Sequence, residues 1–253
     1  MVNLQEIRTM IEKQKLQSPN YYVWNCEDRN NKPNILKIGK RIWDGVLLEE
    51  NVGMELGSRE RPIIKTFLSL EDPSGIHNLR ITVIGQDISD IPLRRCDFGF
   101  LMLMGGNTIS NSDIQKIQRI SVLSHSVEGF FEKRIGRLSW YQISSDLVES
   151  GLSLFHIGST LIHLVKMEFQ SRITAIEILM AVDVDILLAY FKKLHDISRV
   201  ESIKQFQQKI KEIQKLRPDC DLEAECNICD NRAICDQIRD MIAKRNKIRR
   251  ADE

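Results

Sequence analysis

The chain has no apolar run long enough to span a membrane, because even its most apolar stretch, residues 152–165, is interrupted by two histidines and a glycine. Residues 1–25 also lack the unbroken apolar core of a secretory signal peptide, since Glu6, Glu12 and three bases interrupt them. We therefore expect a cytoplasmic protein without a membrane partner. Cysteines rarely form disulfides in the reducing cytosol, so a cluster of them needs another explanation.

Charge of one sign is not in excess either, because 36 lysines and arginines balance 35 aspartates and glutamates, for a net charge of +1. This balance disfavours nucleic acid as a partner, although a short basic run closes the sequence. The diglycine at residues 105–106 lacks the Lys-Ser/Thr of a phosphate-binding loop and is interpreted as a turn. No carboxylate pair and no Ser-His-Asp arrangement is recognisable, so no catalytic residue is assigned.

What the chain does have is a cluster of cysteines near its C-terminal end. Four of the six cysteines fall within sixteen residues, with the spacing C-x5-C-x2-C-x5-C. A C-x2-C pair turns two thiolates toward one point, and two more at loop spacing complete a four-sulfur shell. We therefore predict one metal centre whose ligands are Cys220, Cys226, Cys229 and Cys235.

Three fates of these thiols stay open. Structural zinc sites usually pair two short knuckles, whereas here one spacer is short and both flanking spacers have five residues. A four-iron cluster is larger and accepts ligands that are spaced further apart, so the spacing favours a [4Fe-4S] cluster over zinc. Thiols that bind no metal are the third alternative. Cys26 and Cys96 stand alone in the sequence and are expected not to be ligands.

Hydrophobic patterning predicts an α+β fold, a mixed sheet with packed helices. The stretch 98–104 is apolar on both faces, which predicts a central strand covered on each side. Strands 62–70 and 79–84 are expected to form an antiparallel pair. The expected elements are helix 3–16, an aromatic strand within 18–34, strands 62–70, 79–84 and 98–104, helix 112–133, strand 137–144, helix 145–150, a loop and helix within 151–169, strand 173–182, and helices 185–195 and 200–216.

The same patterning divides the chain into three parts. Residues 1–59 are expected to form an N-terminal helix and an irregular lead-in, and residues 60–216 the α+β domain. Residues 217–253 form a cysteine-rich metal-binding segment with a terminal helix. This last segment has too few apolar residues to hold a core unaided, so we expect the metal to staple it.

Several motifs in the middle of the chain resemble one family. They are Gln118-Arg-Ile-Ser-Val-Leu-Ser-His125, Trp140-Tyr-Gln-Ile-Ser144 and Gly151-Leu-Ser-Leu-Phe-His156-Ile-Gly158, with Val83-Ile-Gly-Gln-Asp-Ile-Ser-Asp-Ile91 upstream. Their order is similar to that in the beta subunit of CO-methylating acetyl-CoA synthase, from the carbon monoxide dehydrogenase/acetyl-CoA synthase complex. The similarity covers about residues 60–185 and continues into a cysteine-bearing C-terminal segment.

The resemblance implies the family's α+β scaffold for residues 60–216. Within it, His156 and Gly158 lie where a loop turns into a helix, so backbone amides there are expected to face an anion such as a phosphate of CoA. The alternative is a hydrogen-bonded structural histidine at position 156. As partners, the resemblance implies subunits of the CO dehydrogenase/acetyl-CoA synthase complex or a corrinoid protein.

The chain also departs from the family's pattern. The family's active centre needs nickel held by a Cys-Gly-Cys element, and this sequence has no Cys-x-Cys. The resemblance therefore implies an iron–sulfur protein without nickel, with an accessory, electron-transfer or partner-docking role. A full component of the complex with acyltransferase activity is the first alternative.

Two further alternatives remain from the cysteines. A zinc-stapled interaction module would use the same four thiols without any reaction. The C-x2-C-x5-C run is also similar to that of RecB-like nucleases with iron–sulfur caps, where Cys26 or Cys96 would supply a fourth ligand. Those nucleases require a Glu-x-Lys motif, which this chain lacks.

Overall fold

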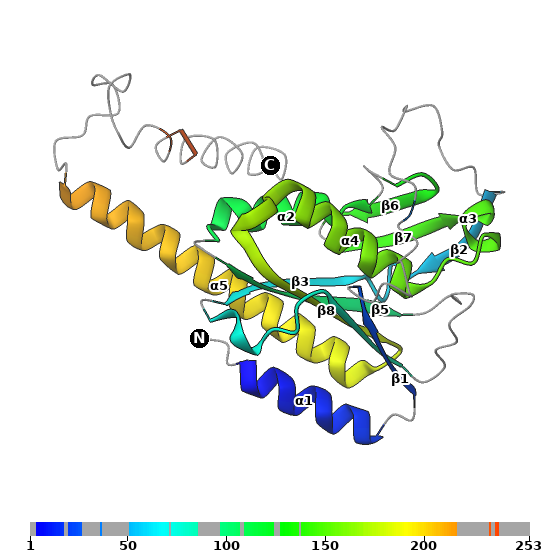
Figure 1. The fold of residues 1–253 in the computed structure, drawn as a ribbon. Helices are drawn as coiled ribbons and strands as arrows, with labels where there is room; N and C mark the ends of the chain where they lie inside the picture. The colour runs from blue at the N-terminus through cyan, green and yellow to red at the C-terminus, as the bar shows by residue number, and fades with distance from the viewer. Residues whose placement is uncertain are drawn as a thin grey trace. The chain divides into compact units, whose positions relative to one another are not determined.

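Two sheets form the framework of the protein in a computed structural model (Figure 1). The structure describes residues 4–17, 20–26, 36, 51–70, 72–85, 97–106, 109–123, 127–136, 138–216, 233 and 236–237. Its elements are α1 (Leu4–Gln17), β1 (Asn20–Asn25), β2 (Val52–Leu56), β3 (Ile64–Leu70), the 3-10 turn η2 (Pro73–Gly75), β4 (Arg80–Gly85), β5 (Phe98–Gly106), α2 (Asn111–Ile120), β6 (Phe130–Ile135), β7 (Leu138–Ser144), α3 (Ser145–Glu149), α4 (Leu154–Phe169), the 3-10 turn η4 (Gln170–Arg172), β8 (Ile173–Val182) and α5 (Asp185–Leu216).

The larger sheet has five strands in the spatial order β1-β4-β8-β5-β3. Strands β4 and β8 are parallel, as are β3 and β5, whereas β1 with β4 and β5 with β8 are antiparallel. The smaller sheet is antiparallel, in the order β2-β7-β6. The predicted α+β fold with a mixed sheet is therefore confirmed, while the cysteine-rich segment lies outside the described residues.

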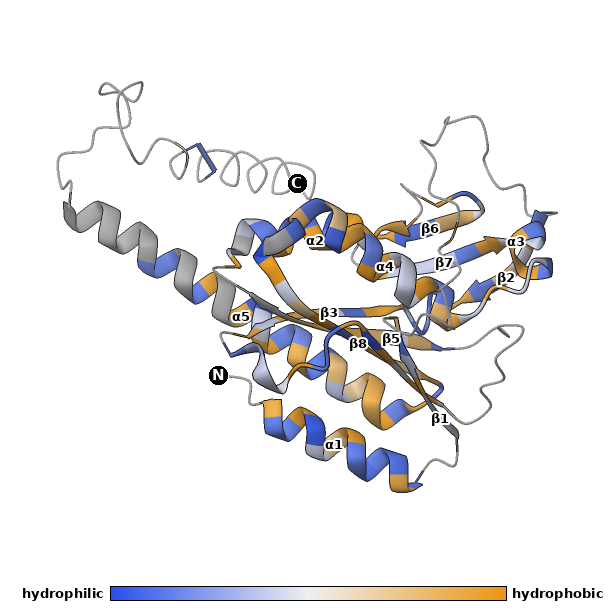
Figure 2. Cartoon of the chain, viewed as in Figure 1, coloured by the Kyte–Doolittle hydropathy of each residue, from blue (hydrophilic) through white to orange (hydrophobic). Residues whose placement is uncertain are grey.

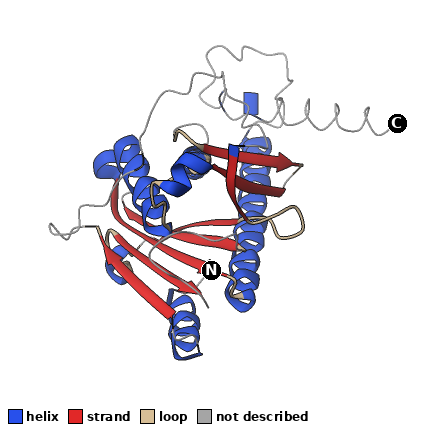
Figure 3. Cartoon of the chain, turned by 90° about the vertical axis from the view of Figure 1, so that its right-hand side faces the viewer, coloured by secondary structure: helices blue, strands red, loops and turns tan. Residues whose placement is uncertain are grey.

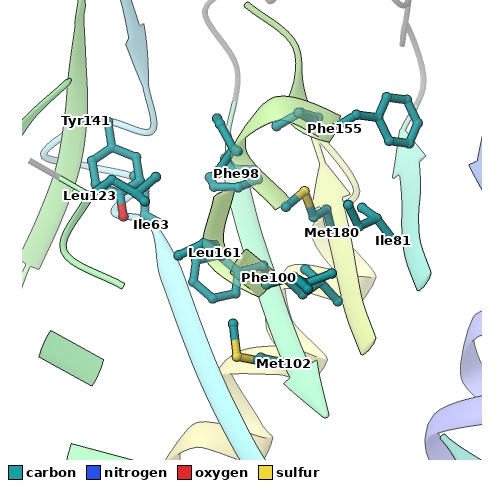
Figure 4. Close-up of a cluster of buried hydrophobic side chains, with 14 of the residues drawn as sticks. Ile63, Ile81, Phe98, Phe100, Met102, Leu123, Tyr141, Phe155, Leu161 and Met180 are labelled. Atoms are coloured by element: carbon teal, nitrogen blue, oxygen red, sulfur yellow. The ribbon is translucent and has the colours of Figure 1, made fainter. Parts of the chain in front are cut away.

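Helices cover both faces of the larger sheet, as Figures 1 and 3 show. Helices α2 and α4 pack on one face, and α1 and the first half of α5 pack on the other. Strand β5 serves both layers, because Phe100 and Met102 contact the α4 side while Leu101 and Leu103 contact the α1 side. Figure 4 shows Phe100 beside Leu161 of α4. The prediction of a strand covered on both faces is confirmed, although β8 rather than β5 takes the middle of the sheet.

Helix α1 confirms the predicted N-terminal helix. Ile7, Ile11 and Gln14 are its buried residues, so one face of the helix lies on the sheet. Figure 2 shows the hydrophilic residues that make up most of the rest of its surface. Among the described residues, no helix is both long enough and apolar enough to cross a membrane.

The predicted helix 112–133 is wrong in its second half. Helix α2 begins with a capping box, in which Ser110 and Asp113 satisfy each other's backbone N–H groups, but it ends at Ile120. Residues Phe130–Ile135 form strand β6 instead and pair with β7. Gly129 precedes the strand with a φ of +82°, a conformation that does not continue a helix. The apolar residues of this stretch are spaced in a way that fits either a helix or a strand. Pairing with β7 favours the strand.

The expected antiparallel pair of strands 62–70 and 79–84 is also wrong. Strand β3 pairs in parallel with β5, and β4 lies between β1 and β8. Five of the six residues of β4 are buried, which fits a strand covered on both faces rather than one in a hairpin. The turn at η2 therefore ends β3 without bringing β4 back beside it.

Two further differences concern the ends of the described chain. Strand β2 was not predicted and pairs with β7, so part of the expected lead-in contributes to the smaller sheet. The helices expected at 185–195 and 200–216 are one continuous helix, α5, because no glycine or proline lies between them to end it. The chain divides into two units, Met1–Ser198 and Arg199–Glu253, and the domain boundaries drawn from the sequence stay predictions.

Candidate functional site

His156 lies in the first turn of α4 and belongs to the cap of that helix. The Ser153 hydroxyl accepts a hydrogen bond from the His156 N–H at 3.4 Å, and His156 Nδ1 accepts one from the Ser153 N–H at 3.0 Å. The imidazole thus takes the place of the glutamate that usually completes a capping box. Burial lowers the pKa of His156, which favours the neutral ring that this acceptor role requires.

Gly158 lies in the same helix and is buried against the larger sheet. A side-chain carbon at this position would come within 2.9 Å of Ile81 Cδ1 and 3.0 Å of Met180 Cε. Glycine therefore allows α4 to approach β4 and β8 closely, which fixes the height of the first helical turns above the sheet. The proposed contact of His156 and Gly158 with an anion stays a prediction.

The N-terminal half of α4 also gathers residues from the start of the chain. The Trp24 ring of β1 lies 4.9 Å from the Phe155 ring, measured between centroids. The Cys26 sulfur lies 3.8 Å from the Ser159 hydroxyl, and the Leu36 N–H donates to the Thr160 hydroxyl at 3.1 Å. The helix that carries His156 is thus anchored by residues more than a hundred positions away.

The four predicted metal ligands, Cys220, Cys226, Cys229 and Cys235, lie outside the described residues, as does Cys96. Within the described part of the chain, no group of three or more His, Cys, Asp or Glu side chains is placed to hold a metal ion. Cys26 is the one cysteine among the described residues, and its sulfur contacts the Ser159 hydroxyl. The assignment of the metal ligands therefore stays a prediction.

A buried ion network that the sequence analysis missed surrounds Glu177 of β8. The carboxylate accepts hydrogen bonds from Arg8 at 2.8 and 2.5 Å, from Arg80 at 3.2 and 3.0 Å, and from the His77 N–H at 2.9 Å. Burial by itself would raise the pKa of Glu177, but these donors outweigh it and hold the pKa below its ordinary value. The network binds α1 to the sheet.

A second buried ion pair joins the two sheets. Lys65 of β3 lies 2.6 Å from Glu132 of β6, and its ammonium lies 4.6 Å from the centre of the Tyr141 ring of β7. Burial by itself would lower the pKa of Lys65, but Tyr141 and Glu132 raise it, so the lysine stays charged. The Tyr141 hydroxyl donates to the Ser121 carbonyl at 2.8 Å. Lys65, Glu132 and Tyr141 thus all have partners within the fold, which argues against a reactive role for them.

The described framework corresponds to a known family. A family model described as the CO dehydrogenase/acetyl-CoA synthase complex beta subunit matches residues 39–187, from ahead of β2 to the start of α5. The chain therefore belongs to this family, as the motifs around Trp140 and His156 indicated. The matched range contains the capped first turn of α4 but not the four clustered cysteines.

One curated relative is the acetyl-CoA decarbonylase/synthase complex subunit beta of Methanopyrus kandleri. It is 26% identical to this chain over 163 residues. That alignment takes in 62% of the chain but 33% of the relative, so the chain spans about a third of the length of this protein.

Proposed function

We propose that this chain is an accessory iron–sulfur protein of the CO dehydrogenase/acetyl-CoA synthase type, which docks on a partner or transfers electrons. The observation that carries the proposal is the combination of two features. The family region spans residues 39–187, and four cysteines with cluster-like spacing follow it. A fold of this family, followed in the sequence by four candidate thiolate ligands, supports an electron-carrying or partner-docking role.

The donor set fits a [4Fe-4S] cluster. Cys220, Cys226, Cys229 and Cys235 supply four thiolates, which is the usual ligand set of such a cluster, and their unequal spacers suit its size. When bound, a cluster of this kind supplies one-electron transfer. Zinc held by the same thiols is the alternative, and it would only stabilise the segment.

The donor set does not fit a nickel centre of the family type. The square-planar nickel site of the family needs a Cys-x-Cys element, and these 253 residues contain none. We therefore propose that this chain alone does not synthesise acetyl-CoA. The alternative, a full component with acyltransferase activity, is favoured by family membership itself and requires nickel ligands of another kind.

For partners, we propose subunits of the CO dehydrogenase/acetyl-CoA synthase complex or a corrinoid protein, in the cytoplasm. The name of the Methanopyrus kandleri relative, a subunit of such a complex, supports this choice. CoA is the proposed small-molecule ligand, with a phosphate at the first turn of α4 near His156. The neutral imidazole expected there would add no charge repulsion or attraction, so the backbone amides would carry the interaction.

A carbonyl-exchange assay tests the proposal at the level of activity. The purified chain, reconstituted with iron and sulfide and then with nickel, is expected to exchange no carbonyl group between acetyl-CoA and labelled CO, because it lacks the nickel ligands. The Methanopyrus kandleri relative, treated in the same way, serves as the reference protein. Nickel-dependent exchange by this chain would replace the accessory function with the enzymatic one.

A further inference from the structure

The β6–β7 hairpin ends in an exposed apolar pair. Ile135 and Leu138 are direct cross-strand partners, and they are 49% and 39% exposed. On the same face of the hairpin, Lys133 pairs with Trp140, which is almost fully buried. The end of the hairpin therefore carries aliphatic surface that the described core does not use.

Two bases flank this pair. Lys133 and Arg134 are exposed, and in the described part of the chain no acidic side chain forms an ion pair with either of them. The adjacent acid, Glu132, is held inside by Lys65 at 2.6 Å. The outer half of β6 thus has two positive charges and no compensating negative charge among the described side chains.

Strand β6 is an edge strand of the smaller sheet, as far as the described residues form it. It lies at the end of the order β2-β7-β6, and within the described residues it pairs with β7 alone. The Ser144 N–H donates to the Gly129 carbonyl at 2.9 Å, so residues 129, 131, 133 and 135 direct their backbone groups toward β7. By the alternation of an antiparallel ladder, the N–H and C=O groups of Glu132 and Arg134 point away from it.

We propose that the outer edge of β6, the side away from β7, binds an extended, acidic segment of another protein, which adds a fourth strand to the smaller sheet. Backbone groups of Glu132 and Arg134 would pair with the added strand. Aliphatic side chains of the segment would pack on Ile135 and Leu138, and its carboxylates would lie beside Lys133 and Arg134.

Charge and surface chemistry favour this occupant over others. Two copies of β6 pairing edge to edge would bring their own lysines and arginines together, which is unfavourable across an antiparallel pair. The bases thus protect the edge from self-association while selecting an acidic strand. Nucleic acid is disfavoured, because the exposed apolar side chains at this end, Ile135 and Leu138, are aliphatic and offer no ring for bases to stack on.

A fluorescein-labelled decapeptide of alternating glutamate and valine is the probe, added to the full chain and followed by fluorescence polarisation. We expect saturable binding that K133E/R134E weakens by about tenfold, since the attraction between the two bases and the carboxylates of the peptide becomes repulsion. The matched control K192E/K193E makes the same change of charge on the exposed face of α5 and should alter binding less than about twofold. Circular dichroism confirms that both variants stay folded.

Two more probes distinguish strand addition from plain charge attraction. N-methylation of alternate residues removes the backbone donors on one edge of the peptide, and the version blocked on the pairing edge should lose binding while the other retains it. Absence of binding, equal loss in both double variants, or equal binding of both methylated peptides would overturn the proposal. So would binding of phosphatidylserine vesicles through Lys133 and Arg134 without any peptide binding, because it would identify a membrane surface instead.

Discussion

Replacement of Phe100 by alanine is expected to reduce the free energy of unfolding by about 3–5 kcal/mol. Phe100 is fully buried in β5, and its ring forms an edge-to-face contact with Phe67 at 5.8 Å between centroids. Helix α4 packs against Phe100 (Figure 4), so the neighbouring side chains have little freedom to move into the cavity that the substitution would leave. Urea denaturation of the variant and the parent protein measures the difference.

Two further variants make this measurement specific. Leu101→Ala removes a buried side chain on the other face of β5 and should cost about 2–5 kcal/mol. Leu16→Ala is the control, because Leu16 is 90% exposed, and it should change stability by less than about 0.5 kcal/mol. A loss below that value at both Phe100 and Leu101 would mean that β5 is a surface strand, contrary to the fold described above.

Replacement of Glu177 by alanine is expected to cost about 3–5 kcal/mol, because it leaves two arginines without their buried partner. The Glu177 side chain is fully buried, whereas those of Arg8 and Arg80 are 18% and 23% exposed. The exposed pair of Glu12 and Lys15 on α1 provides the control, and Glu12→Ala should cost less than about 1 kcal/mol. Equal effects of the two changes would contradict a structural role of the Glu177 network.

The same network predicts how stability depends on pH. Since the pKa of Glu177 is lower in the folded protein than its ordinary value of 4.5, the contribution of the carboxylate to stability is complete above pH 4.5. The contribution is lost as the pH falls through the lower pKa of the folded state. Glu177→Gln should therefore flatten the acid side of the stability profile, and an unchanged profile would show that the carboxylate is not held ionised.

Much of the fold could be predicted because its elements follow simple periodicities. Helix α1 has a clear amphipathic pattern, and β5 is an uninterrupted apolar run between turn residues. Strand β6 could not be predicted in the same way, because Phe130 and Phe131 fit a helical spacing as well as a strand. Local sequence patterns also do not indicate which strands pair with each other. Strands β3 and β5 are neighbours in the sheet although β4 and the turn η2 lie between them in the sequence.

The residues of the candidate site could be predicted from the sequence only in part. The cap at His156 has a local signal, because a serine three residues ahead of it fits a capping box once histidine is allowed as the acceptor. The Glu177 network had only an indirect signal, a single acid within the apolar strand β8. Its partner Arg8 lies 169 positions away, and no local pattern connects the two. The structure therefore adds the tertiary network, while the assignment of the four cysteines as metal ligands rests on their spacing alone and stays a prediction.

Metal analysis of anaerobically purified protein, together with its absorbance spectrum, tests the central claim most directly. We expect a brown protein with about four irons per chain. We also expect iron to be lost when Cys220, Cys226, Cys229 or Cys235 is replaced by serine, whereas Cys26→Ser serves as the matched control and keeps its iron. One zinc per chain in place of iron would contradict the account, and so would loss of iron from Cys26→Ser while Cys220→Ser retains it.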